Sequence, residues 1–185
     1  MLKHSDLKPK VKFILDGEPW EVIDSSFIFK GRGSSTVQAK IKNLINGKVV
    51  TKTFHQNDEF EEAEIERGKV RFLYSKNKKY YFQLDDKNFE IDESILGKKA
   101  LFIKKGDEVQ GIFFEDKLIG IELPLKMTFK VISAPPGLRG GREQPGTKPV
   151  TIETGAIINV PLFVKEGDII EINTETGEYV RRLTS

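Results

Sequence analysis

Residues 36–42 read Thr36-Val37-Gln38-Ala39-Lys40-Ile41-Lys42, a run in which apolar and polar side chains alternate. A period of two puts one set of side chains on a core and the other in water, which is typical of a half-buried β-strand. Apolar segments at 11–15 and 20–23 precede this run, and another at 49–54 follows it. The dipeptide Asp16-Gly17 favours a tight hairpin turn between the first two segments, and Asn46-Gly47 favours one before the last. The stretch therefore predicts antiparallel strands in a small barrel-like unit at the N-terminus.

The rest of the chain repeats this pattern of short strands separated by turns. A second unit begins near Lys69, contains a short helical turn at Asp92–Leu96, and closes with two strands around Glu115-Asp116-Lys117. A third unit begins near Thr128 and includes a long polar loop, Pro135–Pro149. No segment sustains a 3.6-residue period, so we predict an all-β chain of small closed barrels rather than a parallel sheet. We expect three domains, at residues 1–64, 65–127 and 128–185.

The composition is that of an ordinary globular protein, with 185 residues of which 38% are hydrophobic and 31% charged. No apolar run approaches the roughly 20 residues that a membrane span needs. The first six residues, Met1–Asp6, lack the apolar stretch of a signal peptide. The chain has no cysteine, which excludes disulfides and thiolate chemistry. We therefore expect a cytoplasmic protein with no membrane contact.

The chain shows no pattern typical of an enzyme. Its only histidines, His4 and His55, lie far apart and have no neighbours that suggest a metal site or a catalytic triad. We interpret them as an end residue and a strand-end residue. Neither paired carboxylates nor a nucleophile beside a base occurs in the loops. We predict no catalytic residue, no metal and no cofactor.

Charge is unevenly distributed although the net charge is only +2. Residues 1–56 hold ten Lys and Arg against five Asp and Glu, a net of +5, and residues 57–64 hold five acids and no base. The basic first third is thus followed by the acidic segment 57–64, which we expect to act as a hinge. Such a surface suits a polyanionic partner, although a merely solvated basic face has the same composition.

Two loops carry exposed cations. The first, Lys30-Gly31-Arg32-Gly33-Ser34-Ser35, places one arginine between two glycines at the end of a predicted hairpin. Its guanidinium suits phosphate binding or stacking on a base, and a flexible hairpin whose arginine only aids solubility is the alternative. The second, Pro135–Pro149, carries Arg139, Arg142 and Lys148, and either binds single-stranded nucleic acid or is a mobile loop.

The third unit contains the run Lys148-Pro149-Val150-Thr151-Ile152-Glu153-Thr154-Gly155-Ala156-Ile157-Ile158-Asn159-Val160-Pro161-Leu162-Phe163-Val164-Lys165-Glu166-Gly167. This run resembles the signature of the elongation factor P family, with Val150 where the family has alanine. The resemblance covers the whole chain, since Asp16–Pro19, Phe27–Gly33, Pro135–Gly140 and Gly177–Val180 also fit the family in the same order.

The resemblance implies a fold and a function. An SH3-like (KOW-type) barrel is expected first, followed by two OB-fold barrels, in an L shape like that of a transfer RNA. Family members bind the 70S ribosome, its RNA and proteins, between the P and E sites. There they promote peptide bond formation at stalled consecutive-proline sequences by positioning the P-site peptidyl-tRNA or initiator tRNA. We therefore predict a monomeric translation factor and not an enzyme.

The resemblance also implies the working residues. The tip loop Lys30, Gly31, Arg32, Gly33 and Ser34 faces the acceptor end of the P-site tRNA. Arg32 is the position that some members modify, so a tip-modifying enzyme such as an arginine rhamnosyltransferase is an expected partner. The loop at 141–147 departs from the family's glycine-rich run that approaches the E-site codon. An elongation factor P-like paralogue, which also has an arginine tip, and a general single-stranded RNA-binding OB-fold protein are the alternatives.

Overall fold

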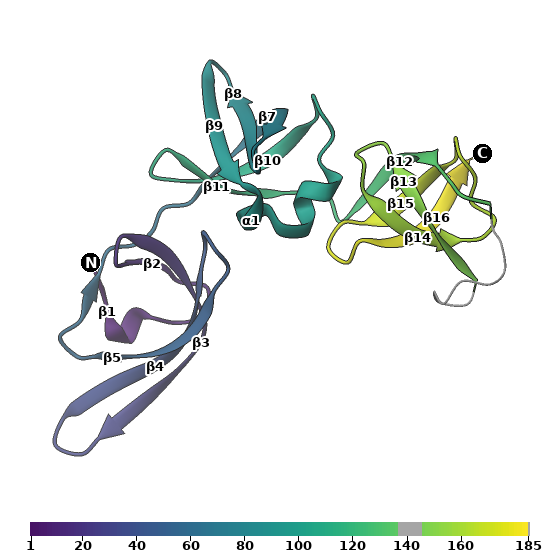
Figure 1. Ribbon diagram of the computed structural model, residues 1–185. Coiled ribbons are helices and arrows are strands. Elements are labelled where there is room, and N and C mark those ends of the chain that lie inside the picture. Colours follow the sequence, from purple (N-terminus) through teal and green to yellow (C-terminus); the bar gives the residue numbers. More distant parts are fainter. Residues whose placement is uncertain (137–145, 185) are drawn as a thin grey trace. The chain divides into compact units, whose positions relative to one another are not determined.

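The computed structural model describes residues 1–136 and 146–184, and short antiparallel strands make up most of it (Figure 1). The all-β prediction is confirmed. Within these residues no helix has the length and apolar character to cross a membrane. The elements are β1 (Leu2–Lys3), the 3₁₀ helix η1 (His4–Asp6), β2 (Lys12–Leu15), β3 (Glu18–Lys30), β4 (Ser34–Asn43), β5 (Val49–His55), β6 (Glu59–Phe60), β7 (Glu66–Lys76), β8 (Lys79–Leu84), β9 (Lys87–Asp92), α1 (Glu93–Leu96), the 3₁₀ helix η2 (Gly97–Phe102), β10 (Glu108–Phe114), β11 (Lys117–Glu122), β12 (Lys126–Ser133), β13 (Thr147–Ile152), β14 (Ile157–Pro161), β15 (Ile169–Asn173) and β16 (Glu178–Thr184).

The strands of the described residues form four sheets. Their orders are β2-β3-β4-β5, β1-β6, β11-β10-β7-β8-β9 and β14-β13-β12-β15-β16. Backbone contacts group the chain into two compact units, the first made of residues 1–68 and 111–120 and the second of residues 69–110 and those from 121 onward. The expected division into three domains stays a prediction.

Two-residue turns join many of these strands. Asp16 and Gly17 have φ of 54° and 78°, as the Asp-Gly signal predicted. Asn77-Lys78 and Glu115-Asp116 adopt the same left-handed backbone without a glycine, with φ between 48° and 61°. At the second place the sequence predicted a three-residue turn, Glu115-Asp116-Lys117, but β11 already begins at Lys117. The strands on either side end directly at these two-residue turns, so the chain must reverse within two residues. The four residues therefore adopt positive φ although none of them is a glycine.

The core of the first unit combines alternate residues of the sheet β2-β3-β4-β5 with Phe60 of β6. The rings of Phe13, Phe54 and Phe60 pack edge to face, with centroids 5.1–5.8 Å apart. Phe60 belongs to the acidic segment that we expected to act as a hinge. Backbone hydrogen bonds from Ile14 N–H to Glu61 (2.8 Å) and from Ala63 N–H to Lys12 (3.0 Å) instead fasten this segment to β2.

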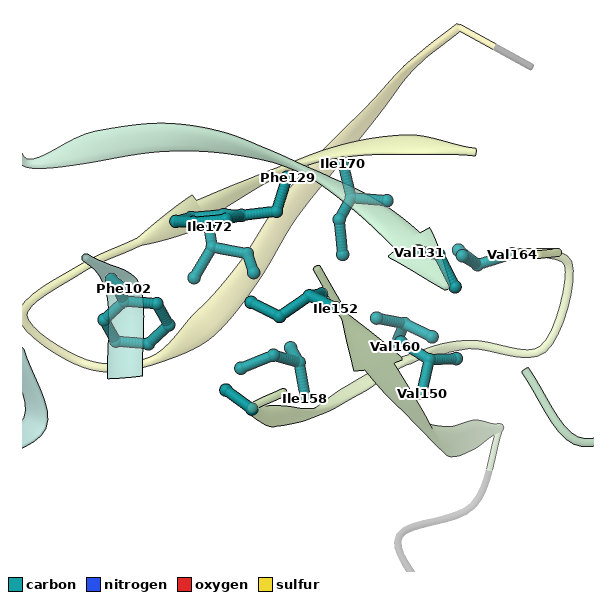
Figure 2. Packing of buried hydrophobic residues seen from close by; sticks show 11 residues of the cluster. Phe102, Phe129, Val131, Val150, Ile152, Ile158, Val160, Val164, Ile170 and Ile172 are labelled. Atoms are coloured by element: carbon teal, nitrogen blue, oxygen red, sulfur yellow. The ribbon is translucent and has the colours of Figure 1, made fainter. Parts of the chain in front are cut away.

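The C-terminal sheet of the second unit curls around its own core (Figure 2). Alternate residues of β13, β14 and β15 point inward, and Phe102 of η2 joins them with its ring 5.8 Å from that of Phe129. The predicted helical turn at Asp92–Leu96 is present as α1, and it continues into η2, which the sequence did not predict. The polar loop expected up to Pro149 ends earlier, because β13 begins at Thr147.

Candidate functional site

The β3–β4 hairpin carries the first predicted site. The two strands stay paired from Trp20 opposite Asn43 to Lys30 opposite Ser34, which leaves a three-residue turn. The neighbouring strand β5 pairs with β4 only as far as Thr36. Beyond that point the hairpin continues as a two-stranded ribbon (Figure 1). We call residues 27–35 the tip.

Arg32 occupies the middle of this turn and is exposed. Its φ is +73° and that of Gly33 is +79°, so two successive residues adopt the left-handed backbone. For a residue with a Cβ, this conformation costs about 1–2 kcal/mol. Gly31 has no positive φ, so only one of the two glycines around Arg32 is required by the backbone. The turn holds the base of the arginine side chain in a defined direction at the end of the ribbon.

His4, which the sequence suggested was only an end residue, fastens the hairpin to the rest of the unit. It lies in η1 and is 6% exposed. Its Nε2 is 2.9 Å from Oγ of Ser35, across 31 residues of sequence. Its Nδ1 is buried and has no partner among the described residues. No local signal marks this contact, because it depends on where β4 brings Ser35.

An aromatic row runs from His4 towards the turn. The His4 and Phe27 rings lie 5.8 Å apart, and those of Phe27 and Phe29 lie 4.8 Å apart at 58°. Phe27 and Phe29 are two residues apart on β3 and share one face of the strand. Phe27 is 45% exposed and Phe29 is 82% exposed. Both residues lie in the stretch Phe27–Gly33 that resembles the family's tip hairpin, but the sequence indicates no role for either ring.

The hairpin region is strongly basic. Residues 25–57 contain six Lys and Arg and no Asp or Glu. All six of these bases are exposed: Lys30, Arg32, Lys40, Lys42, Lys48 and Lys52. In the part of the chain that the structure describes, neither Lys30 nor Arg32 forms an ion pair. The cations at the tip are therefore available to an anionic partner.

The structure describes only part of the second predicted site, the loop Pro135–Pro149. Arg139 and Arg142 lie outside the described residues. Lys148 lies in β13 opposite Val160, and it is 7% exposed. It therefore belongs to a strand rather than to the loop in which the sequence placed it. Its contact with RNA stays a prediction.

Two ionisable groups of the described residues, Lys79 and Tyr80, have shifted pKa values. No group of three or more His, Asp or Glu side chains at 1–136 and 146–184 is placed to hold a metal ion. Burial raises the pKa of Tyr80 above its ordinary 10.0, and the hydrogen bond to Glu90 raises the pKa of Lys79 above its ordinary 10.5. Both groups thus keep their protons at neutral pH, where neither is a base.

Comparison with known proteins covers almost the entire chain. Residues 3–60 match the model of the elongation factor P (EF-P) KOW-like domain, residues 65–121 that of the elongation factor P (EF-P) OB domain, and residues 127–182 that of elongation factor P, C-terminal. These matches confirm the predicted KOW-type and OB-fold architecture.

Full-length relatives agree with the domain models. Elongation factor P of Desulfotalea psychrophila is 38% identical over 99% of both chains, and that of Carboxydothermus hydrogenoformans is 35% identical over 99% of this chain and 100% of its own. A solved structure, eukaryotic translation initiation factor 5A from Methanococcus jannaschii, shares the fold with a TM-score of 0.50 and 18% identity, covering 63% of this chain and 87% of that one. The relatives carry the name of a translation factor rather than of an enzyme. The chain therefore belongs to the elongation factor P family.

Proposed function

We propose that this chain binds the ribosome between the P and E sites and promotes peptide bond formation at consecutive prolines. In this proposal the chain holds the acceptor end of the P-site tRNA, and the ribosome supplies the chemistry. Membership of the elongation factor P family supports a role in translation. A ribosomal partner also fits the expected cytoplasmic location.

The observation that carries the proposal is the position of Arg32. An exposed guanidinium lies at the end of a two-stranded ribbon, in a turn whose backbone is fixed by two positive φ angles. A ribbon is narrow enough to enter a crevice that a whole barrel cannot enter. The guanidinium is charged at every relevant pH and binds phosphate through two parallel hydrogen bonds. The tip is thus suited to reach and hold an RNA end.

The physical effect of such a contact is entropic. Two reactants that are held in a reactive geometry lose less freedom on the way to the transition state, so their reaction accelerates without an added acid or base. This agrees with the tip residues, where a guanidinium, an ammonium and hydroxyls are present but no carboxylate. The acid-free stretch 25–57 adds long-range attraction to RNA phosphate, so affinity for the ribosome should fall as salt rises.

Three further assignments belong to this proposal. Arg32 is the proposed site of a covalent modification that lengthens the tip, made by a dedicated enzyme. Arg139, Arg142 and Lys148 are proposed as RNA contacts of the third domain. The proposed domains are residues 1–64, 65–127 and 128–185. Intact mass of the protein from its native cell, with peptide fragmentation around Arg32, tests the modification.

The proposal is tested by Arg32→Ala in a strain that lacks its own factor. Arg32 is exposed and makes no ion pair among the described residues, so the variant should fold normally and still lose rescue of a reporter with consecutive prolines. Lys48→Ala also removes an exposed charge, from the loop at the opposite end of β4, and should keep rescue. Equal rescue by both variants would contradict the role of the tip. Binding to free RNA that depends on Arg139, Arg142 and Lys148 but not on Arg32 would favour the general RNA-binding alternative.

A further inference from the structure

Phe29 is an unusual residue to find at the end of a ribbon. Its side chain is 82% exposed, the highest value among the large hydrophobic residues that the structure describes. Burying a phenylalanine side chain is worth about 1.5–3 kcal/mol, and this position gains little of that stabilisation. Phe27, two residues earlier on the same face of the strand, is also exposed, at 45%, whereas Ile28 lies on the opposite face. The tip therefore presents a small apolar surface directly beside two cations.

The surroundings of Phe29 hold the ring in place without covering it. Its cross-strand neighbour is Ser35, a small residue whose hydroxyl is engaged by His4 at 2.9 Å. Phe27 contacts the ring at 4.8 Å and 58°, an inclined arrangement rather than a parallel stack. Phe27 itself lies against buried His4. The ring is thus braced from the inner end of the row while a face stays open to solvent.

The charges around the ring indicate what it binds. Lys30 is the next residue and Arg32 lies three residues on, and no acid occurs from residue 25 to 57. A flat aromatic ring beside cations is the arrangement with which proteins bind unpaired nucleotides, because bases stack on the ring while the cations hold phosphates. A protein interface buries about 800 Å² on each partner, several times the area of one phenyl ring. A single nucleobase matches the size of the ring.

We propose that Phe29 is a base-stacking residue, which receives one unpaired nucleobase of RNA on its ring while Lys30 and Arg32 contact the flanking phosphates. On the ribosome this inference rests on the proposed function, and it names the contact: an unpaired base at the tRNA acceptor end. The contact with Phe27, which in turn lies against His4, restricts the ring before the base arrives and so lowers the cost of binding.

The first experiment uses a short single-stranded RNA with one 2-aminopurine, whose fluorescence is quenched when the base stacks. The full-length chain should quench it, and Phe29→Ala should weaken binding about 5- to 150-fold, the range that base–aromatic stacking gives on alanine substitution. Phe29→Tyr and Phe29→Trp should quench as the unmodified chain does, since each side chain has an aromatic face. Ile28→Ala removes an apolar side chain from the opposite face of the strand and should bind like the unmodified chain.

An abasic version of the same RNA separates stacking from charge. It keeps the phosphates, so it should bind the unmodified chain only as well as the complete RNA binds Phe29→Ala. The abasic RNA and Phe29→Ala tested together should lose no more affinity than either change alone. If Phe29→Ala binds and quenches as the unmodified chain does, or if the abasic RNA binds as tightly as the complete RNA, the inference is wrong.

A second arm distinguishes this inference from the proposed function. Ribosomes receive a P-site tRNA with 2-aminopurine at its terminal adenosine, and co-sedimentation measures binding of the chain. Quenching that Phe29→Ala abolishes supports both proposals. If the chain does not bind ribosomes but quenches the free RNA through Phe29, the stacking site stands and the proposed function fails. If the chain binds ribosomes and Phe29→Ala lowers affinity without any quenching in the unmodified chain, Phe29 contacts a ribosomal protein or another RNA segment, and the inference is overturned.

Discussion

Replacing His4 by alanine should loosen the β3–β4 hairpin. His4 is almost fully buried, its Nε2 bonds to Ser35 on β4, and its ring lies against Phe27 on β3. One side chain therefore touches both strands of the hairpin near the tip. Its removal should free the end of the ribbon before it affects the rest of the sheet.

The size of the effect follows from three contributions. Burial of a ring of this size is worth about 2 kcal/mol, and its hydrogen bond about 1 kcal/mol. Removing the unpartnered Nδ1 offsets about 1 kcal/mol of that loss. His4→Ala should thus cost about 2 kcal/mol. His4→Phe keeps the ring and loses both the bond and the unpartnered nitrogen, so it should be nearly neutral.

Amide hydrogen exchange measures this local stability in the full-length chain. For residues 25–37, exchange should accelerate about 30-fold in His4→Ala and stay near the unmodified rate in His4→Phe. His55→Ala is the control, because the other histidine is exposed at the end of β5. If His4→Phe accelerates exchange as much as His4→Ala, the hydrogen bond rather than ring packing holds the hairpin. If His4→Ala has no effect, the anchoring role is refuted.

Three further predictions concern other parts of the chain. Gly33→Ala should destabilise the tip turn by about 1–2 kcal/mol, because φ is +79°, whereas Gly31→Ala should be tolerated; hydrogen exchange at the turn compares them. Asp168→Ala should lower the stability of the second unit by about 1–3 kcal/mol in chemical denaturation, because a buried carboxylate accepts the Lys165 N–H at 2.9 Å. Burial raises the pKa of Tyr80 in the folded state, so the stability that its neutral hydroxyl contributes is complete below pH 10.0 and is lost as the pH rises above that value. Tyr80→Phe should therefore resist unfolding in alkaline titration better than the unmodified chain.

Much of the fold follows from local patterns. Val37, Ala39 and Ile41 are buried and the intervening residues of β4 are exposed, as the alternation predicted. The Asp16-Gly17 turn has the predicted left-handed backbone. Both features depend only on residues close in sequence, where a period of two or a glycine leaves few conformations open.

The candidate site was predictable only in part. Arg32 between its glycines was recognisable as the end of a hairpin, and the structure places it there. Lys148 was expected in a loop, yet it lies in β13, because pairing with β14 extends the strand to Thr147. The roles that we propose for both residues, including modification of Arg32, stay predictions.

The sequence by itself determined the all-β class, the order of the strands along the chain and the family, because these depend on short-range periodicity and on a long ungapped signature. Only the tertiary structure decided which residues brace the tip. His4 meets Ser35 across 31 residues, and Phe60 joins Phe13 and Phe54 in a core that no local pattern announces. Such contacts depend on how separate strands pack together. The exposure of Phe29 likewise appears only once the ribbon extends beyond its neighbouring strand.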